Sequence, residues 1–221
     1  MATAKKQQAE IEEEKKISAT EQFYNQYKKA IWGTIIAVLA VFLCVLGYSK
    51  FIYAPACAQA QEAAYPAEIN FQAGEFQLAL EGDGNVLGFE DICSQYGAKA
   101  GKAVYLYAGI CNLQLGNNEQ AIKYLKKYNG KDTILAARAL ACIGDAMVNL
   151  DDVKGAVAYF EKAAAKGDNV FAAAYLLKAG VCYEALGNNA KALACYKQIK
   201  DKYPQSFEAY DIDKNIAKVS E

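Results

Sequence analysis

The feature that most constrains the fold of this chain is a segment that occurs twice. Residues 108–121 read AGICNLQLGNNEQA, residues 179–192 read AGVCYEALGNNAKA, and the two agree at eight of fourteen positions. A weaker copy, CIGDAMVNLDDVKGA, occupies residues 142–156 between them. Chains that repeat at intervals of roughly 20–50 residues stack one small unit several times, because a single unit cannot bury its apolar face alone.

Each copy carries the same three landmarks at nearly constant spacing. They are a glycine, an alanine twelve residues later and a large residue four residues after that: Gly109, Ala121 and Leu125; Gly144, Ala156 and Phe160; Gly180, Ala192 and Tyr196. Small residues let two antiparallel helices approach closely, and the large residue fills the space beside them. The sequence LGNN, at 115–118 and 186–189, is typical of a glycine that ends a helix before a turn. The pattern predicts stacked helical hairpins.

These landmarks resemble the tetratricopeptide repeat, which has small and bulky residues in the same order. The resemblance implies an all-α fold, an α-solenoid of stacked helical hairpins. Its three clear repeats would span about 102–135, 137–170 and 173–206. A degenerate copy with Gly88 and Ile92 in the alanine and bulky positions is expected before them, and an amphipathic C-terminal capping helix within 206–219 after them.

An uncharged segment near the N-terminus predicts a membrane span. Residues 30–49 read AIWGTIIAVLAVFLCVLGYS and lie between Lys29 and Lys50. Twenty helical residues rise about 30 Å, the hydrocarbon thickness of a bilayer. A long polar segment precedes the apolar one, which also exceeds the length of a signal-peptide core. We therefore expect a retained membrane anchor over residues 30–53 that contacts the lipid bilayer.

The distribution of lysine predicts the topology. Four lysines lie shortly before the apolar segment: Lys15, Lys16, Lys28 and Lys29. After Lys50, in contrast, the next basic residue is Lys99. Basic flanks stay on the cytoplasmic side, so the N-terminus is predicted in the cytoplasm and the repeats outside it. The expected parts are a charged cytosolic tail (1–29), a transmembrane helix (30–53), a helical stalk bent at Pro55 or Pro66 (54–68) and the repeat domain (69–221).

Composition excludes several classes of function. The chain has no histidine, a single arginine at Arg138 and a formal net charge of −1. Catalytic Ser-His-Asp or Cys-His groups and histidine-bearing zinc sites are therefore impossible. Nucleic-acid-binding proteins normally concentrate basic residues, arginine above all, on one face. We expect a non-enzymatic protein with no cofactor, no metal site and no nucleic-acid partner.

The cysteines run partly against this topology. Four of the seven lie inside apolar helical patterns and are expected to pack as small apolar side chains: Cys111, Cys142, Cys182 and Cys195. Oxidising compartments select against unpaired thiols, which disfavours an extracytoplasmic domain. The lysine asymmetry is the more direct indicator, because buried thiols are protected.

In the tetratricopeptide family the first helices of the hairpins line a groove that holds peptides or partner helices. The resemblance carries this role to nine residues here: Leu106, Ile110, Leu113, Arg138, Asp145, Val148, Leu177, Val181 and Glu184. An apolar helix or extended segment is expected along this groove. The lysine–asparagine clamp for chaperone C-terminal tails is absent, since Leu106, Ile110 and Cys142 occupy its positions. The alternative is that the capping helix or the stalk packs into part of the groove.

The whole arrangement resembles the bacterial ancillary Sec-translocon subunit family, whose repeats are related to those of cell-division coordinator proteins. The similar stretches are FQLALEGDGNVLGFEDICSQYG at 76–97 and YLYAGICNLQLGNNEQAIKYL at 105–125. The resemblance implies a non-catalytic adaptor of the inner membrane with a periplasmic repeat domain. Its implied partners are translocon subunits, a periplasmic chaperone or isomerase, and secreted chains. The alternative function is a cytoplasm-facing import receptor or membrane scaffold of reversed topology.

Overall fold

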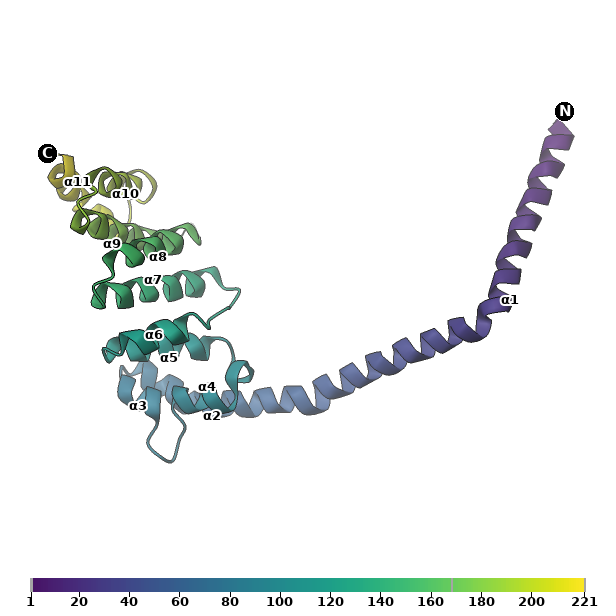
Figure 1. Cartoon of the computed structure of the whole chain (residues 1–221), viewed down its shortest axis with the longest axis horizontal. Helices are drawn as coiled ribbons and strands as arrows, with labels where there is room; N and C mark the ends of the chain where they lie inside the picture. Colours follow the sequence, from purple (N-terminus) through teal and green to yellow (C-terminus); the bar gives the residue numbers. More distant parts are fainter. Residues whose placement is uncertain (1, 168, 221) are drawn as a thin grey trace. The chain divides into compact units, whose positions relative to one another are not determined.

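The computed structural model describes residues 2–167 and 169–220, with side chains described from residue 20 onward. It divides into two compact units, Met1–Pro55 and Ala56–Glu221. The predicted all-α class is confirmed: the described elements are helices (Figure 1), and the strand-like pairing found among them is an isolated bridge between Gly82 and Leu87.

The first unit is a long helix with an exposed apolar surface. Helix α1 spans Ala2–Tyr48 and a π-helical turn spans Ser49–Tyr53. Helix α2, Ala54–Gln72, begins at the end of this unit and lies mostly in the second. Within the segment predicted to enter the membrane, Val38 and Val41 are 68% and 65% exposed. By length and composition, this is a helix that can cross a membrane. Water is a poor solvent for such a surface, and the hydrocarbon of a bilayer is a good one.

The helix does not end at Pro55. Proline has no N–H for the carbonyl four residues before it, and its ring crowds that carbonyl. Just before Pro55 the backbone widens into the π-helical turn, where the N–H of Ala54 donates to the carbonyl of Ser49, five residues back. Pro66 also lies inside α2. Helical structure therefore continues along the chain past both prolines.

One face of α2 belongs to the core of the second unit. Ala60, Ala64 and Ala67 recur every three or four residues and are at most 1% exposed. They share a buried cluster with residues from further along the chain, including Phe89 and Val104. Residues 54–68, expected to form a stalk, thus supply a packed surface to the repeat unit as well as a connection.

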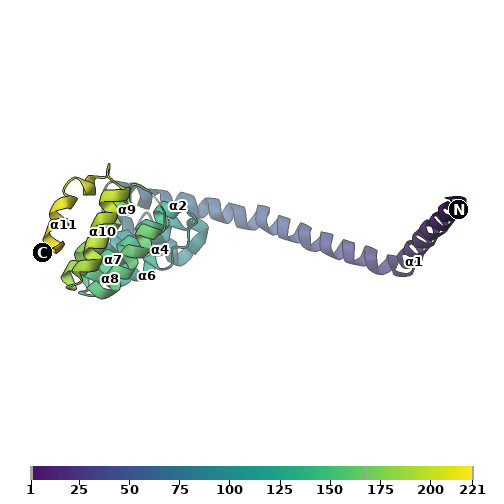
Figure 2. The same ribbon diagram turned by 90° about the horizontal axis from the view of Figure 1, so that it is seen from above.

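Three helical hairpins follow one another along the second unit, as the views in Figures 1 and 2 show. Their helices are α5 (Ala103–Gln114) with α6 (Asn118–Leu125), α7 (Thr133–Asn149) with α8 (Val153–Ala165), and α9 (Ala172–Ala185) with α10 (Asn189–Lys202). The turns inside the hairpins place Gly116, Asp151 and Gly187 at φ of 80°, 61° and 71°. Glycine adopts this left-handed conformation without strain, which explains the two LGNN segments.

The recurring glycines bring the two helices of each hairpin together. A methyl group added to Gly109, Gly144 or Gly180 would lie less than 3 Å from a side chain of the partner helix. Those side chains are the predicted large residues, Leu125, Phe160 and Tyr196, all at most 1% exposed. The large residue therefore packs directly on the glycine of its own hairpin.

The ends of the array differ from its middle. Before α5, the short helices α3 (Phe76–Glu81) and α4 (Phe89–Gln95) and a 3-10 turn (Gly97–Ala100) form the degenerate copy, with Gly88 close to the backbone of Leu80. After α10, a 3-10 turn (Phe207–Ala209) leads to the predicted capping helix α11 (Ile212–Ser220). Helix α11 packs on α10 and buries Ile212 and Val219.

Candidate partner-binding groove

Five of the nine predicted groove residues line one open hollow. It has a volume of about 540 Å³ and lies among the first helices of the three hairpins, α5, α7 and α9. The five are Leu113, Asp145, Val148, Leu177 and Val181. Phe160 of α8 also lines it, and Val148 and Val181 are 37% and 53% exposed. Apolar side chains left in contact with water at a concave surface are the usual mark of a binding site.

An ion pair crosses this hollow. The ammonium of Lys178 on α9 donates to both carboxylate oxygens of Asp145 on α7, at 2.6 and 2.8 Å. The same ammonium lies 5.7 Å from the centre of the Phe160 ring. Both side chains are substantially exposed, so the pair contributes at most about 1 kcal/mol to stability. Its charges stay within reach of a polar group on a bound partner.

Lys178 was not among the predicted groove residues. The available signal was its spacing of 33 residues from Asp145, close to one repeat length, which puts the two on adjacent first helices. Opposite charges at that interval indicate a pair between repeats.

Leu106 and Ile110 are predicted groove residues that do not line the hollow. They are 1% and 9% exposed and belong to a core cluster with Leu125 and Ile143. Phe71, at the end of α2, packs against this cluster, and its ring centre lies 4.9 Å from that of Tyr107. Leu106 and Ile110 are therefore core residues of the first repeat, and the alternative that the stalk (54–68) or the capping helix packs into part of the groove stays a prediction.

Glu184 is bound within the chain. It accepts a hydrogen bond from the Tyr196 hydroxyl at 2.5 Å and forms an ion pair with Lys218 of α11. These two partners, Lys218 first, hold the pKa of Glu184 below its ordinary value. Burial, then the hydrogen bond to Glu184, raises the pKa of Tyr196. Glu184 thus fastens the capping helix to the end of α9, while Val181 remains exposed and Leu177 half-buried.

Arg138 is exposed on α7, outside the residues that line the hollow. It lies near Cys142, where burial raises the pKa of the thiol and the charge of Arg138 partly opposes that rise. The charge of Arg138 therefore lowers the pKa of the Cys142 thiol, one turn along the same helix.

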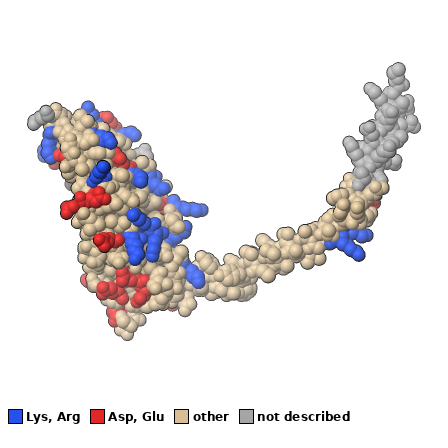
Figure 3. All heavy atoms as spheres, in the orientation of Figure 1, with Lys and Arg blue, Asp and Glu red and all other residues tan. Residues whose placement is uncertain are grey.

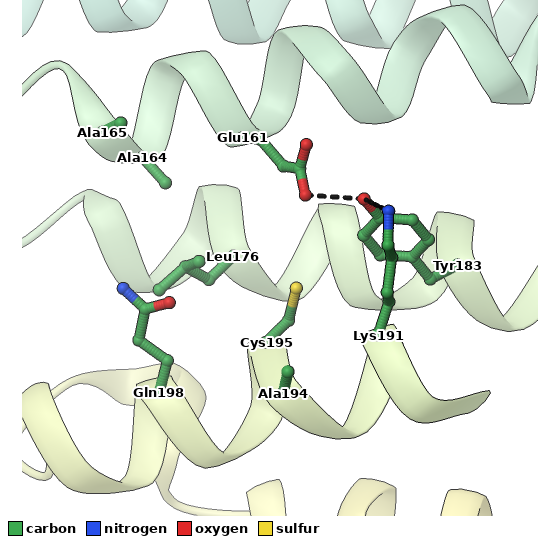
Figure 4. Close-up of a pocket in the computed structure, with 9 residues that line it drawn as sticks. All are labelled: Glu161, Ala164, Ala165, Leu176, Tyr183, Lys191, Ala194, Cys195 and Gln198. Carbon is green, nitrogen blue, oxygen red and sulfur yellow. Dashed lines mark hydrogen bonds between the residues drawn. The ribbon is translucent and has the colours of Figure 1, made fainter. Parts of the chain in front are cut away.

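A second hollow, of about 350 Å³, lies among α8, α9 and α10 (Figure 4). The Tyr183 hydroxyl donates to Glu161 at 2.6 Å, and the Lys191 ammonium stands 5.1 Å from the centre of the Tyr183 ring. Burial and the Glu161 carboxylate raise the pKa of Tyr183. Tyr183, Glu161 and Lys191 are polar partners of one another in this hollow.

The cysteines of the repeats are buried as predicted, and burial is the main cause of their high pKa values. The pKa is raised to about 12 at Cys111 and to about 11 at Cys195. Cys142 and Cys182 shift in the same direction. Among the described residues all seven cysteines are unpaired. The four buried ones, Cys111, Cys142, Cys182 and Cys195, pack as small apolar side chains.

Stacked helical hairpins whose first helices face an open hollow define a class of protein-interaction scaffold. Sequence comparison names the repeat: the tetratricopeptide repeat family matches residues 103–131 and 174–206. The hairpin of α7 and α8 lies between these matches and has the same helix–turn–helix form. The chain therefore carries tetratricopeptide repeats, as predicted, and this fold is typical of proteins that bind other proteins without catalysing a reaction.

Two solved structures share this fold. A "Crystal structure of MamA" is 21% identical with a TM-score of 0.54, over 70% of this chain and 92% of that one. A "Crystal structure of MamA protein" is 20% identical with a TM-score of 0.55, over 74% and 87%. At this level of identity the likeness concerns the fold. No curated protein sequence matches the chain significantly.

Proposed function

We propose that this protein is a membrane-anchored adaptor whose repeats bind partner proteins at the extracytoplasmic face of the membrane. The observation that carries the proposal is the open apolar hollow on a fold used for protein interaction. The chain that leads into this fold contains a helix long and apolar enough to hold it in a bilayer.

The hollow indicates the chemistry of the partner. Leu113, Leu177 and Val181 offer aliphatic contacts, and the Asp145–Lys178 pair offers one charge of each sign. A helix or extended segment with one or two aliphatic or aromatic side chains fits this surface, because such side chains fill the hollow while a polar neighbour meets the pair. The binding energy comes mainly from removing Leu177 and Val181 from water.

We further propose that the partners belong to protein export at the Sec translocon. Support comes from the sequence resemblance to the ancillary translocon subunit family and from the lysine asymmetry around residues 30–49. The proposed partners are translocon subunits, a periplasmic chaperone or isomerase, and secreted chains emerging from the channel.

The proposal is tested by photo-crosslinking in cells from a probe at Val181, which is exposed in the hollow. Translocon subunits, an isomerase or nascent secreted chains among the products support a role in export. Crosslinks confined to the protein's own helices overturn the groove as a partner site. A probe at Ile110, the equivalent buried position, is the matched control and should give intramolecular products.

A second test addresses topology. A reporter that is active only outside the cytoplasm is fused after Glu221 in the full chain. Activity supports the extracytoplasmic orientation. A reporter active only in the cytoplasm, giving signal from the same junction, overturns it in favour of a cytoplasm-facing receptor or scaffold.

A further inference from the structure

Charge is segregated between two successive parts of the second unit. Residues 51–98 contain seven acidic residues and no basic one, whereas residues 99–131 contain six lysines and one acidic residue, Glu119. In Figure 3 the basic side chains gather on the side of the unit where α2 begins, and acidic side chains gather toward its other side. The net charge of the whole chain is only −1, yet acidic and basic residues are concentrated in different segments of the second unit.

Five exposed lysines form what we call the basic edge: Lys99, Lys102, Lys126, Lys127 and Lys131. They come from the loop before α5 and from the end of α6, and the Lys102 ammonium joins these segments by donating to the carbonyl of Asn129 at 3.2 Å. In Figure 1 the loops that follow α4 and α6 lie on the side where α2 begins. Ala60 of α2 and Ala100, next to Lys99, share one buried cluster.

Tyrosines are interleaved with these lysines. The Lys127 ammonium lies 5.8 Å from the centre of the Tyr105 ring and 5.4 Å from that of Tyr124. Both rings are half-buried. Lysine and tyrosine side chains that present an apolar body and a polar tip are favoured at the surface of a membrane, where one end meets hydrocarbon and the other meets headgroups.

The chain holds this edge close to the bilayer. From Lys50, the first charged residue after the apolar segment, to Ala60 is ten helical residues, or about 15 Å of rise. Ala100, next to Lys99, shares a buried cluster with Ala60 and is therefore tied to the chain a short distance after Lys50. Because the unit is tethered to the bilayer, the effective concentration of lipid headgroups near the basic edge is far higher than that of any dissolved partner.

We infer that the basic edge binds anionic phospholipid headgroups and so holds the repeat unit against the membrane surface. Each lysine near an anionic surface contributes favourably, and the acidic side, repelled by that surface, turns away from it. This inference rests on the proposed membrane anchoring. It adds that the unit has a fixed orientation on the bilayer, set by its own charges.

The test uses the full chain reconstituted in vesicles of phosphatidylcholine, with and without one third phosphatidylglycerol. Asn129, exposed within the basic edge, is replaced by the photo-crosslinking residue p-benzoylphenylalanine, and covalent lipid adducts are measured by mass spectrometry. Leu150, exposed in the turn between α7 and α8, is the control site. We expect phosphatidylglycerol adducts from position 129 at roughly ten times the yield from position 150.

Lys126→Gln, Lys127→Gln and Lys131→Gln together should reduce the yield at position 129 about tenfold. Lys154→Gln, Lys197→Gln and Lys202→Gln make the same change in charge elsewhere and should leave it intact. Because the first triple variant also removes the contact of Lys127 with two rings, the unaltered protein is examined at molar salt too, where screening should abolish the adducts.

The outcomes separate this inference from the proposed function. Protein that carbonate releases from the vesicles contradicts the membrane anchor. Protein that stays inserted but gives equal yields at positions 129 and 150, or yields indifferent to charge and salt, overturns the basic edge alone. Protein adducts in place of lipid adducts at position 129 in cells would also overturn it, by assigning the edge to a protein partner.

Discussion

The first and third repeats carry nearly the same sequence and expose different surfaces. Leu106 and Leu177 are equivalent positions, yet Leu106 is 1% exposed and Leu177 lines an open hollow. Ile110 and Val181, one turn further, are 9% and 53% exposed. The two first helices have different neighbours. Phe71 from α2 packs against the first, whereas α11 is fastened at the far end of the third and leaves its middle free.

Side chains at equivalent repeat positions point the same way in each hairpin. Whether such a side chain is exposed to solvent depends on the segments that pack around its hairpin. Substitutions at equivalent residues of the two repeats test this directly.

The largest effect is expected for Leu106→Asp, which puts a carboxylate into a buried apolar core. It should lower the free energy of unfolding by about 4 kcal/mol or more. Denaturation followed by circular dichroism measures it.

Leu177→Asp is the matched control, since its carboxylate can reach water. It should cost less than about 1 kcal/mol of stability. Equal losses for the two variants would contradict the difference in coverage between the repeats.

The next effect concerns binding. Val181→Asp should lower the yield of partner crosslinks at Leu177 by roughly 10- to 100-fold, because a charge replaces an apolar contact at the centre of the hollow. The helical circular dichroism should not change. Val148→Asp, on the neighbouring helix, should act in the same direction, and undiminished crosslinking in both variants would exclude the hollow.

Substitution by alanine should cost more stability at Gly180, in the third hairpin, than at Gly109, in the first. Gly180→Ala should lower the free energy of unfolding by about 2 kcal/mol, because the added methyl meets a Tyr196 ring that is fixed at its far end by Glu184. Gly109→Ala should cost about half as much, since it meets the more adaptable Leu125 side chain. Thermal melts compare the two. Tyr196→Phe should reduce the cost of Gly180→Ala, and an unchanged cost would show that the ring is not held by its hydroxyl.

A pH effect is expected from Glu184 in the third repeat. The folded pKa of Glu184 lies below its ordinary value of 4.5, so its stabilising contribution is complete above that value. The contribution is lost as the pH falls through the lower, folded pKa. Glu184→Gln should therefore flatten the loss of stability below about pH 4.5 and cost about 1 kcal/mol at neutral pH. Urea titrations between acidic and neutral pH measure both changes. If the loss of stability at acidic pH is the same in Glu184→Gln as in the unaltered protein, another carboxylate is responsible for it.

The smallest effect is that of the ion pair in the hollow. A double-mutant cycle with Asp145→Asn and Lys178→Met should give a coupling energy of about 0.2–1 kcal/mol, because both side chains are partly solvated. A coupling above about 2 kcal/mol would mean that the pair supports the stacking of α7 and α9 and is not available to a partner.

The repeats were predictable because their determinants are local and periodic. Gly144 and Phe160 lie sixteen residues apart in one hairpin, and the same spacing recurs in the other two copies of the sequence. The exposure of the groove was not predictable in the same way. The burial of Leu106 involves residues of other helices, such as Ile143 of α7, and Phe71 at the end of α2 packs against the same cluster. The ion pair of Lys178 joins two different repeats, so only a comparison across the period would have revealed it.

The burial of the thiols has a chemical consequence for where the repeat unit can exist. The thiolate is the form of cysteine that reacts with disulfides and peroxides. With a pKa of about 11, Cys195 has about one thiolate in ten thousand molecules at neutral pH, and Cys111, with a pKa of about 12, has fewer. Oxidation of these side chains must be correspondingly slow. The buried thiols of Cys111 and Cys195 are therefore compatible with a location on either side of a membrane.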